Sequence, residues 1–94
     1  MPYYVYILLC QGNSLYTGYT RNLDMRMRLH KKGKGARYTR MHRPERLVHV
    51  EEFRSRAEAM KRERRIKKLN HHQKLELANT RARSTRHLEK RKAH

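Results

Sequence analysis

The sequence predicts a single α+β domain in which a three-stranded antiparallel sheet, made of a β-hairpin and one further strand, is flanked by helices. Two runs of β-branched and aromatic residues near the N-terminus, separated by turn formers, predict the hairpin. Two later segments carry helix-capping signals, and a third strand-like run lies between the first helix and these segments. With 94 residues the chain has room for one domain and no more.

The first strand is expected at residues 3–10 (YYVYILLC) and the second at residues 14–20 (SLYTGYT). The turn formers Gln-Gly-Asn at residues 11–13 join them into a hairpin. Because side chains alternate along a strand, Tyr6 faces away from the most apolar side of the first strand. Tyr16 is expected on the more polar face of the second strand.

Asn22 is a plausible N-cap for a helix that runs through Lys32, and Gly33 supplies a left-handed residue just after it. Arg26 and His30 are four residues apart, so they project from the same side of this helix.

A basic loop is predicted at residues 31–46 (KKGKGARYTRMHRPER), because two Gly and one Pro interrupt any regular pattern there. Its density of positive charge is typical of a loop that faces phosphates. Residues 47–53 (LVHVEEF) have strand composition and add the third strand. The candidate nucleic-acid contacts are Lys34, Arg37, Tyr38 and Arg40 in the loop, together with Lys67.

Two capping signals follow. Ser55 with Glu58 predicts a helix to about residue 69, and Asn70 with Gln73 predicts a shorter one to about residue 78. We therefore expect the folded domain at residues 1–78 and a basic tail at residues 79–94, as a frayed helix or a disordered arm.

Glu63 is the most informative position of the longer helix. At 100° per residue it falls within the apolar stripe, between Ala59 and Ile66, although the opposite face could have hosted a surface acid. A carboxylate that faces inward costs several kcal/mol unless it is paired or holds a metal. Pairing with Lys67 is the structural alternative.

The charge of the chain indicates a polyanionic partner. Lys and Arg number 25 against 8 Asp and Glu, which gives a net charge of +17 and a pI near 11.0. Nucleic acid is the usual partner of so basic a domain, and an anionic membrane surface is the weaker alternative. The first thirty residues are nearly neutral, so the positive charge lies in the loop, the later helices and the tail.

The single cysteine, Cys10, excludes an intramolecular disulfide and a cysteine-based zinc site, and its expected state is a buried, inert thiol. The apolar run at the N-terminus is too short for a signal peptide or a membrane span. These features predict a cytoplasmic protein with no membrane partner. The adjacent His71 and His72 diverge on a helix and do not suggest a metal site.

Five side chains suit phosphodiester hydrolysis: the hydroxyls of Tyr6 and Tyr16, the Arg26 and His30 pair, and the Glu63 carboxylate. A base must accept a proton from water, a cation must stabilise the charge on the phosphoryl oxygens, and a carboxylate can hold a divalent metal. A single carboxylate with open water positions is typical of Mg²⁺. Taken alone, the tyrosines could be packed strand aromatics and the Arg26 and His30 pair an exposed helix face.

These residues closely resemble the GIY-YIG nuclease superfamily, and within it the small stand-alone YhbQ-like and YazA-like bacterial subgroup. Tyr4-Val5-Tyr6 stands at the first tripeptide and Tyr16-Thr17-Gly18 at the second. Arg26 matches the arginine of the family, His30 its histidine or tyrosine, and Glu63 its metal-binding glutamate. The stretch GKGARYTR at residues 33–40 is characteristic of the subgroup.

The resemblance implies a divalent-metal-dependent endonuclease or exonuclease that acts on DNA, in repair or recombination, with Mg²⁺ or Mn²⁺ as cofactor. In it Tyr6 and Tyr16 are a general base and its hydroxyl partner, in an order left open, and Arg26 contacts the scissile phosphate. His30 orients a tyrosine or binds phosphate, and Glu63 binds the metal. Tyr4 replaces the glycine of the first tripeptide, and Tyr19 stands where some repair members carry a lysine.

Two other functions compete with nuclease activity. A non-catalytic, basic nucleic-acid-binding module on the same fold would show salt-dependent binding without metal-dependent turnover. A peripheral membrane or ribosome-associated protein rests on charge alone. The sequence leaves open the preferred strand structure, DNA versus RNA, and the oligomeric state.

Overall fold

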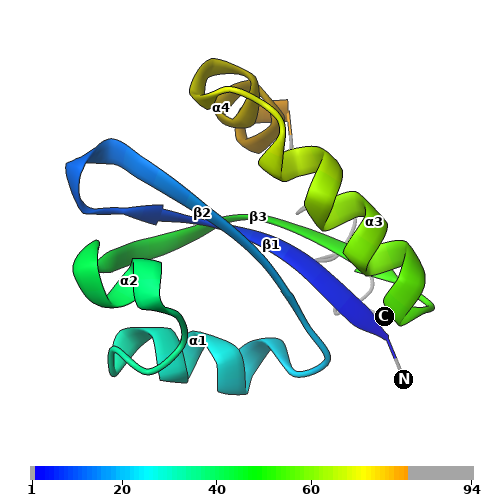
Figure 1. The fold of residues 1–94 in the computed structure, drawn as a ribbon, viewed down its shortest axis with the longest axis horizontal. Coiled ribbons are helices and arrows are strands. Elements are labelled where there is room, and N and C mark those ends of the chain that lie inside the picture. The colour runs from blue at the N-terminus through cyan, green and yellow to red at the C-terminus, as the bar shows by residue number, and fades with distance from the viewer. Residues whose placement is uncertain (1, 81–94) are drawn as a thin grey trace.

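A computed structural model describes residues 2–80 of the chain, and it confirms the predicted α+β fold (Figure 1). The antiparallel sheet has the strand order β2-β1-β3, so the first strand of the chain is the central one. Residues 81–94, which make up most of the predicted tail, lie outside the described residues. The elements are β1 (Tyr3–Cys10), the 3-10 turn η1 (Gln11–Asn13), β2 (Ser14–Thr20), α1 (Leu23–Lys31), α2 (Arg37–Met41), β3 (Pro44–Phe53), α3 (Arg56–Lys67) and α4 (His71–Thr80).

The central strand β1 is buried from both sides, because helices cover both faces of the sheet (Figure 1). Helices α3 and α4 lie on one face, where the alternation of β1 and β2 directs their most apolar side chains. The buried residues of this core are Val5, Ile7, Leu15, Ala59 and Ile66.

The opposite face carries a second core beneath α1, and it is this face that holds the predicted tyrosines. Tyr6 is buried there and Tyr16 packs against it, as the alternation predicts. Cys10 belongs to the same core, so the expectation of a buried free thiol is confirmed, and burial raises the pKa of that thiol. The buried members are Tyr6, Leu8, Cys10 and Val50.

All three capping predictions are confirmed. The Asn22 side chain accepts a hydrogen bond from the backbone N–H of Met25, and Gly33 has a φ of 76° just beyond α1. Ser55 accepts from the N–H of Glu58 at 3.2 Å, which opens α3. Before α4, the Asn70 and Gln73 side chains each bond the backbone N–H of the other, a reciprocal capping box.

The loop predicted over residues 31–46 was wrong in part, because α2 forms inside it. Its hydrogen bonds run from the Arg40 N–H to the Ala36 carbonyl and from the His42 N–H to the Tyr38 carbonyl. Although Gly and Pro suggested a loop, the eight residues between Gly35 and Pro44 contain neither, which is room for a short helix. The third strand also begins earlier than predicted, at Pro44. A proline is tolerated there because it is the first residue of an edge strand.

Glu51 of β3 ties α3 to the sheet. Arg62 donates to both of its carboxylate oxygens, from Nε at 2.7 Å and from Nη2 at 2.9 Å, and His49 Nε2 lies 2.7 Å from Oε2. Burial raises the pKa of the Glu51 carboxyl, but the hydrogen bonds from His49 and Arg62 outweigh burial and hold it at about 2. The carboxylate therefore stays ionised at any physiological pH, and the two-point contact fixes the position of α3.

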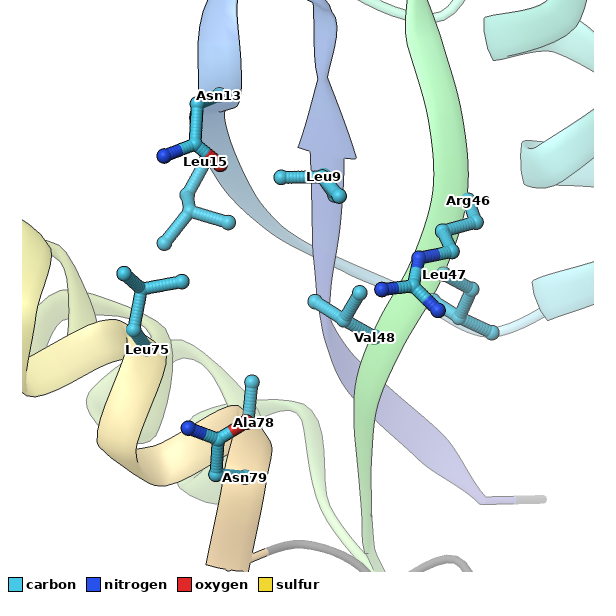
Figure 2. Close-up of a pocket in the computed structure, with 9 residues that line it drawn as sticks. All are labelled: Leu9, Asn13, Leu15, Arg46, Leu47, Val48, Leu75, Ala78 and Asn79. Atoms are coloured by element: carbon cyan, nitrogen blue, oxygen red, sulfur yellow. The ribbon is translucent and has the colours of Figure 1, made fainter.

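A groove of about 480 Å³ separates α4 from the hairpin end of the sheet (Figure 2). Leu75 of α4 and Leu15 of β2 point toward one another across it, and Arg46 lines it from β3. None of the five predicted site residues lines this groove, so it lies apart from the candidate chemistry. Within residues 2–80, no helix is long and apolar enough to cross a membrane.

Candidate active site

Tyr6 and His30, which are 24 residues apart in the sequence, meet beneath α1. The Tyr6 hydroxyl lies 2.8 Å from His30 Nε2, and each side chain is only 1 % exposed. His30 comes from the last turn of α1 and Tyr6 from the middle of the central strand. A solvated helix face, which the sequence left as an alternative for His30, is therefore excluded.

The second ring nitrogen of His30 is held by α2. His30 Nδ1 lies 2.8 Å from the Thr39 hydroxyl oxygen, and that hydroxyl donates to the Ala36 carbonyl at 3.1 Å. Thr39 is itself 1 % exposed. Since its single proton is used on Ala36, its oxygen is left to accept from Nδ1–H, and Nε2 is then free to accept the proton of Tyr6.

The opposite tautomer satisfies fewer groups. If Nε2 carried the proton, Thr39 would have to donate to Nδ1 and give up Ala36, and the Tyr6 proton would lose its acceptor. The observed contacts therefore assign a one-way chain of donors from Tyr6 to His30, from His30 to Thr39, and from Thr39 to Ala36. Burial and the nearby Arg26 guanidinium both lower the pKa of His30, so its ring is neutral at pH 7, as this chain requires.

We expect Thr39→Val to loosen the His30 tautomer, because valine keeps the shape of threonine but offers no acceptor to Nδ1–H. The ¹⁵N resonances of the His30 ring should change from a single Nδ1-protonated form to a mixture, and the rate of any cleavage should fall about tenfold. Thr39→Ser, which keeps the hydroxyl, should restore both the single Nδ1-protonated form and the rate of cleavage. An unchanged tautomer in Thr39→Val would show that the assigned direction of the chain is incorrect.

Tyr16 stands at the mouth of this buried chain. Its ring is partly exposed and packs edge-on against His30, with 5.3 Å between ring centroids, while the Tyr6 centroid lies 6.3 Å away. Burial, and then the Glu63 carboxylate, raise the pKa of the Tyr16 hydroxyl, whereas Arg26 lowers it. Burial, followed by Tyr16, likewise raises the pKa of Tyr6. The two predicted tyrosines are thus in one site, but only Tyr16 reaches its surface.

Arg26 joins this site to the basic loop. Arg26 lies one turn of α1 before His30, and its Nη1 donates to the Gly35 carbonyl at 3.2 Å. Its charge partly offsets the burial that raises the pKa of both tyrosine hydroxyls. A guanidinium has five N–H donors, so one bond to Gly35 leaves the others for a ligand. The predicted cation is therefore fixed in direction and still available.

Glu63 approaches the tyrosines from α3, on the other face of the sheet from α1. Its side chain is 15 % exposed, and its carboxylate raises the pKa of both Tyr6 and Tyr16. Lys67, which is half exposed, lies 3.5 Å from Oε2. The prediction of an inward-facing acid and the structural alternative of a Lys67 pair are therefore both seen.

The donor set around Glu63 fits a hydrated Mg²⁺ better than a metal held by protein alone. Among the described residues, no three His, Cys, Asp or Glu side chains gather in a group that could hold a metal ion. Mg²⁺ commonly keeps several waters and binds through one or two carboxylates together with substrate phosphates. A single, partly exposed carboxylate beside a surface tyrosine meets that requirement, and the weak contact with Lys67 can be exchanged.

One of the candidate nucleic-acid contacts of the basic segment, Tyr38, lies at the mouth of the site. Tyr38 of α2 stacks on Tyr16 with 5.8 Å between centroids and 26° between planes, and His42 packs on Tyr38 at 4.5 Å. Lys67 is brought close through Glu63. The side chains of Lys34, Arg37, Tyr38 and Arg40 are all exposed.

Sequence reasoning missed Thr39 and Gly35. A methyl group on Gly35 would lie 2.3 Å from His30 Nδ1, so the loop backbone packs directly against the imidazole ring. Both residues belong to the stretch at residues 33–40 that carries the family resemblance. The available signal was the position of Thr39, which lies in a glycine-containing stretch shortly after the candidate site residue His30 and could have suggested a hydrogen-bond partner for that histidine.

Comparison with known proteins extends these observations. The profile of the GIY-YIG catalytic domain matches residues 2–76. A UPF0213 protein of Staphylococcus haemolyticus is 52% identical over 75 residues, which cover 80% of this chain and 92% of that protein. A UPF0213 protein of Oceanobacillus iheyensis is 51% identical over 75 residues, covering 80% of this chain and 87% of the relative.

Two solved structures are similar in both sequence and fold. The solution NMR structure of a UPF0213 protein from Bacillus halodurans shares 46% identity and a TM-score of 0.56, over 85% of each chain. The solution NMR structure of a protein from E. faecalis shares 41% identity and a TM-score of 0.59, again over 85% of each chain. The matched residues 2–76 of the profile span the sheet, α1, α2 and α3, and therefore all of the side chains assembled above.

Proposed function

The chain belongs to the GIY-YIG family, whose members are generally nucleases, and from this membership we propose that it hydrolyses phosphodiester bonds in DNA with a divalent metal. The observation that carries the proposal is that Tyr16 packs on His30 of the buried Tyr6 and His30 pair, while the charges of Glu63 and Arg26 both act on the Tyr16 hydroxyl. A water-activating group, a cation and a metal-binding carboxylate are the parts that such a hydrolysis needs.

We assign the proton transfer from the attacking water to Tyr16. Tyr16 is the partly exposed residue of the pair, and although burial and Glu63 raise the pKa of its hydroxyl, the charge of Arg26 favours the ionised form. Tyr6 is buried, and its proton is committed to His30 Nε2. In this proposal Tyr6 and His30 hold the Tyr16 ring in place, His30 by edge-on packing and Tyr6 by a tilted ring contact, and both stay uncharged during the reaction.

Arg26 stabilises the negative charge that develops on the phosphoryl oxygens. Its bond to the Gly35 carbonyl sets the direction of the guanidinium before substrate arrives, so little reorganisation is needed during the reaction. Glu63 is the residue that would hold the divalent metal, Mg²⁺ or Mn²⁺, which supplies charge neutralisation for the leaving oxygen. Release of Lys67 from Glu63 frees that carboxylate and gives the lysine to a phosphate.

Nucleic acid is the proposed partner, since the net charge is +17 and the cations of the basic segment are exposed, in the segment whose Tyr38 stacks on Tyr16. DNA repair or recombination in the cytoplasm is part of the proposal. The buried, unpaired Cys10 is consistent with a reducing compartment.

The test is incubation of supercoiled plasmid and of labelled single-stranded and branched oligonucleotides with the full chain, in Mg²⁺, Mn²⁺ or EDTA. Glu63→Gln keeps the size of the side chain and should abolish metal-dependent cleavage, and Arg26→Ala should lower the rate at least 100-fold. Gel shifts in EDTA should show that Glu63→Gln still binds the DNA. Undiminished cleavage by Glu63→Gln would disprove the assigned site.

The second function, a nucleic-acid-binding module without catalysis, is favoured by one observation: Lys67 Nζ lies 3.5 Å from the Glu63 carboxylate in the structure. It is distinguished by the same experiment. Steeply salt-dependent binding by the wild type, with no cleavage in either metal, would establish it in place of the nuclease.

A further inference from the structure

A second basic pocket lies beside the candidate active site. Its volume is about 490 Å³, and three of the residues that line it are arginines. Among the described residues that line this pocket there is no carboxylate. The side chains used below are Tyr3, Tyr19, Arg21, Arg26 and Arg56.

The topology explains why three arginines meet here. β1 begins, and β2 and β3 end, at the same end of the antiparallel sheet (Figure 1). Each of the two outer strands is followed by a helix, so α1 and α3 both begin at this end, on opposite faces of the sheet. Arg21 lies just before the N-cap of α1, Arg26 lies in the first turn of α1, and Arg56 is the first residue of α3.

Two aromatic side chains hold the guanidinium groups in position. Arg56 Nε donates to the Tyr19 hydroxyl at 3.3 Å, and the Arg21 guanidinium lies over the Tyr3 ring at 5.5 Å from its centroid. These contacts use one donor of Arg56 and the face of Arg21, so most of their N–H groups stay available. Arg21 and Arg56 are exposed and Arg26 is half-buried, and within residues 2–80 none of the three takes part in a salt bridge.

The acids nearest in sequence do not fill the pocket. Asp24 lies in the first turn of α1 and is exposed to solvent. Glu58 lies in the first turn of α3, where its Oε1 accepts a hydrogen bond from the Ser55 hydroxyl at 3.2 Å. Neither lines the pocket, so the positive charge of the three guanidinium groups is not compensated by a carboxylate among the residues that line it.

We infer that this pocket binds one backbone phosphate of the nucleic-acid strand, next to the phosphate that is cleaved. The inference rests on the proposed function, because Arg26 is the residue that connects the two sites. Arg26 lines the pocket, and the same guanidinium donates to Gly35 beside His30. A strand that places one phosphate at Arg26 therefore has its neighbour within reach of Arg21 and Arg56, which fixes the register of the substrate on the enzyme.

The first test measures anion binding without cleavage. The full chain is titrated with inorganic phosphate in EDTA at constant ionic strength, and the arginine Nε–Hε signals are followed by NMR. The Arg21 and Arg56 signals should shift together and saturate, while Arg64, which is exposed on the same α3 helix, should not follow them. In Tyr19→Phe, which removes the hydroxyl that orients Arg56, the dissociation constant should rise about twofold.

The second test asks whether the pocket contacts a backbone phosphate of a nucleic-acid strand, by measuring how oligonucleotide binding depends on salt. Binding of a labelled oligonucleotide in EDTA is compared for the wild type, for the double variant Arg21→Ala and Arg56→Ala, and for Arg64→Ala. Losing one phosphate contact should lower the slope of log K against log salt by about 0.7 for a single strand or 0.9 for a duplex. We expect this loss in the double variant and an unchanged slope in Arg64→Ala.

The outcomes separate this inference from the nuclease proposal, because both tests are made without metal. Saturable phosphate shifts together with the reduced slope support the pocket even if no substrate is cleaved. Phosphate shifts that are linear and equal for all arginines overturn it. An unchanged slope with saturable phosphate binding also overturns the backbone assignment and indicates a site for a free anion.

Discussion

Tyr16→Phe should reduce phosphodiester cleavage at least 100-fold, while Tyr6→Phe should retain about a tenth of the wild-type rate. A positioned general base typically contributes a factor of about 100 to 10,000, and Tyr16 is the partly exposed tyrosine of the pair. Tyr6 is 1 % exposed and its hydroxyl is bonded to His30, so its loss disturbs the packing behind Tyr16 without removing the group that meets water.

The measurement is the initial rate on an oligonucleotide substrate in Mg²⁺, beside binding in EDTA and thermal unfolding of each variant. The wild-type rate should also rise between pH 7 and 9. Burial and Glu63 raise the pKa of the Tyr16 hydroxyl above its ordinary value, so the range from pH 7 to 9 lies below this pKa. The ionised form, which accepts the proton, therefore becomes steadily more abundant as the pH increases through this range. A Tyr6→Phe variant that is the slower of the two would transfer the base role to Tyr6.

Gly35→Ala should abolish activity and lower the stability of the fold by about 1–3 kcal/mol. The added methyl group would lie 2.3 Å from His30 Nδ1 and 2.6 Å from Cγ, so the ring or the loop has to move. Either movement breaks the hydrogen bond between His30 and Thr39, and displacement of the loop also takes the Gly35 carbonyl from Arg26. One methyl group thus disturbs both the neutral histidine and the phosphate-binding cation.

The matched control is Gly12→Ala in the hairpin turn. Gly12 has a φ of 75°, and a methyl group there would meet nothing within 4 Å. Alanine at this φ costs about 1–2 kcal/mol of backbone strain, so the midpoint of thermal unfolding should fall while cleavage by the folded protein stays unchanged. Full activity of Gly35→Ala, with the His30 ring signals unaltered, would show that the loop does not press on the ring.

The parts of the fold that follow local rules were predictable from the sequence. Strand alternation placed Tyr6 and Tyr16 on one face, and the side-chain caps at Asn22, Ser55 and Asn70 marked where three helices begin. Each of these signals operates over a few residues, so no tertiary information was needed to read it.

The parts that depend on contacts across the fold were not predictable. Helix α2 is only five residues long, and its buried Thr39 is explained by a histidine nine residues earlier rather than by a local pattern. The pocket of Arg21 and Arg56 arises because two helices begin at the same end of the sheet. For Glu63 the helical periodicity indicated the inward direction, but only the structure shows that Lys67 pairs with it as well.

The strand order β2-β1-β3 also governs how the chain emerges from the ribosome. The central strand is made first and can pair at once with β2 through a three-residue turn, which is a local contact. Its other edge waits for β3, which begins at Pro44, more than thirty residues after Cys10. Until then the nascent hairpin exposes an unpaired edge and two apolar faces, the features that favour aggregation.

The order of the elements also determines which face of the hairpin is covered later in synthesis. α3 and α4, which cover one face, are synthesised last, so that face of the hairpin stays bare longest. The high positive charge of the intervening segment opposes self-association of nascent chains during this interval. The charge of the basic segment is therefore expected to favour solubility of a sheet whose central strand is made before the helices that cover it.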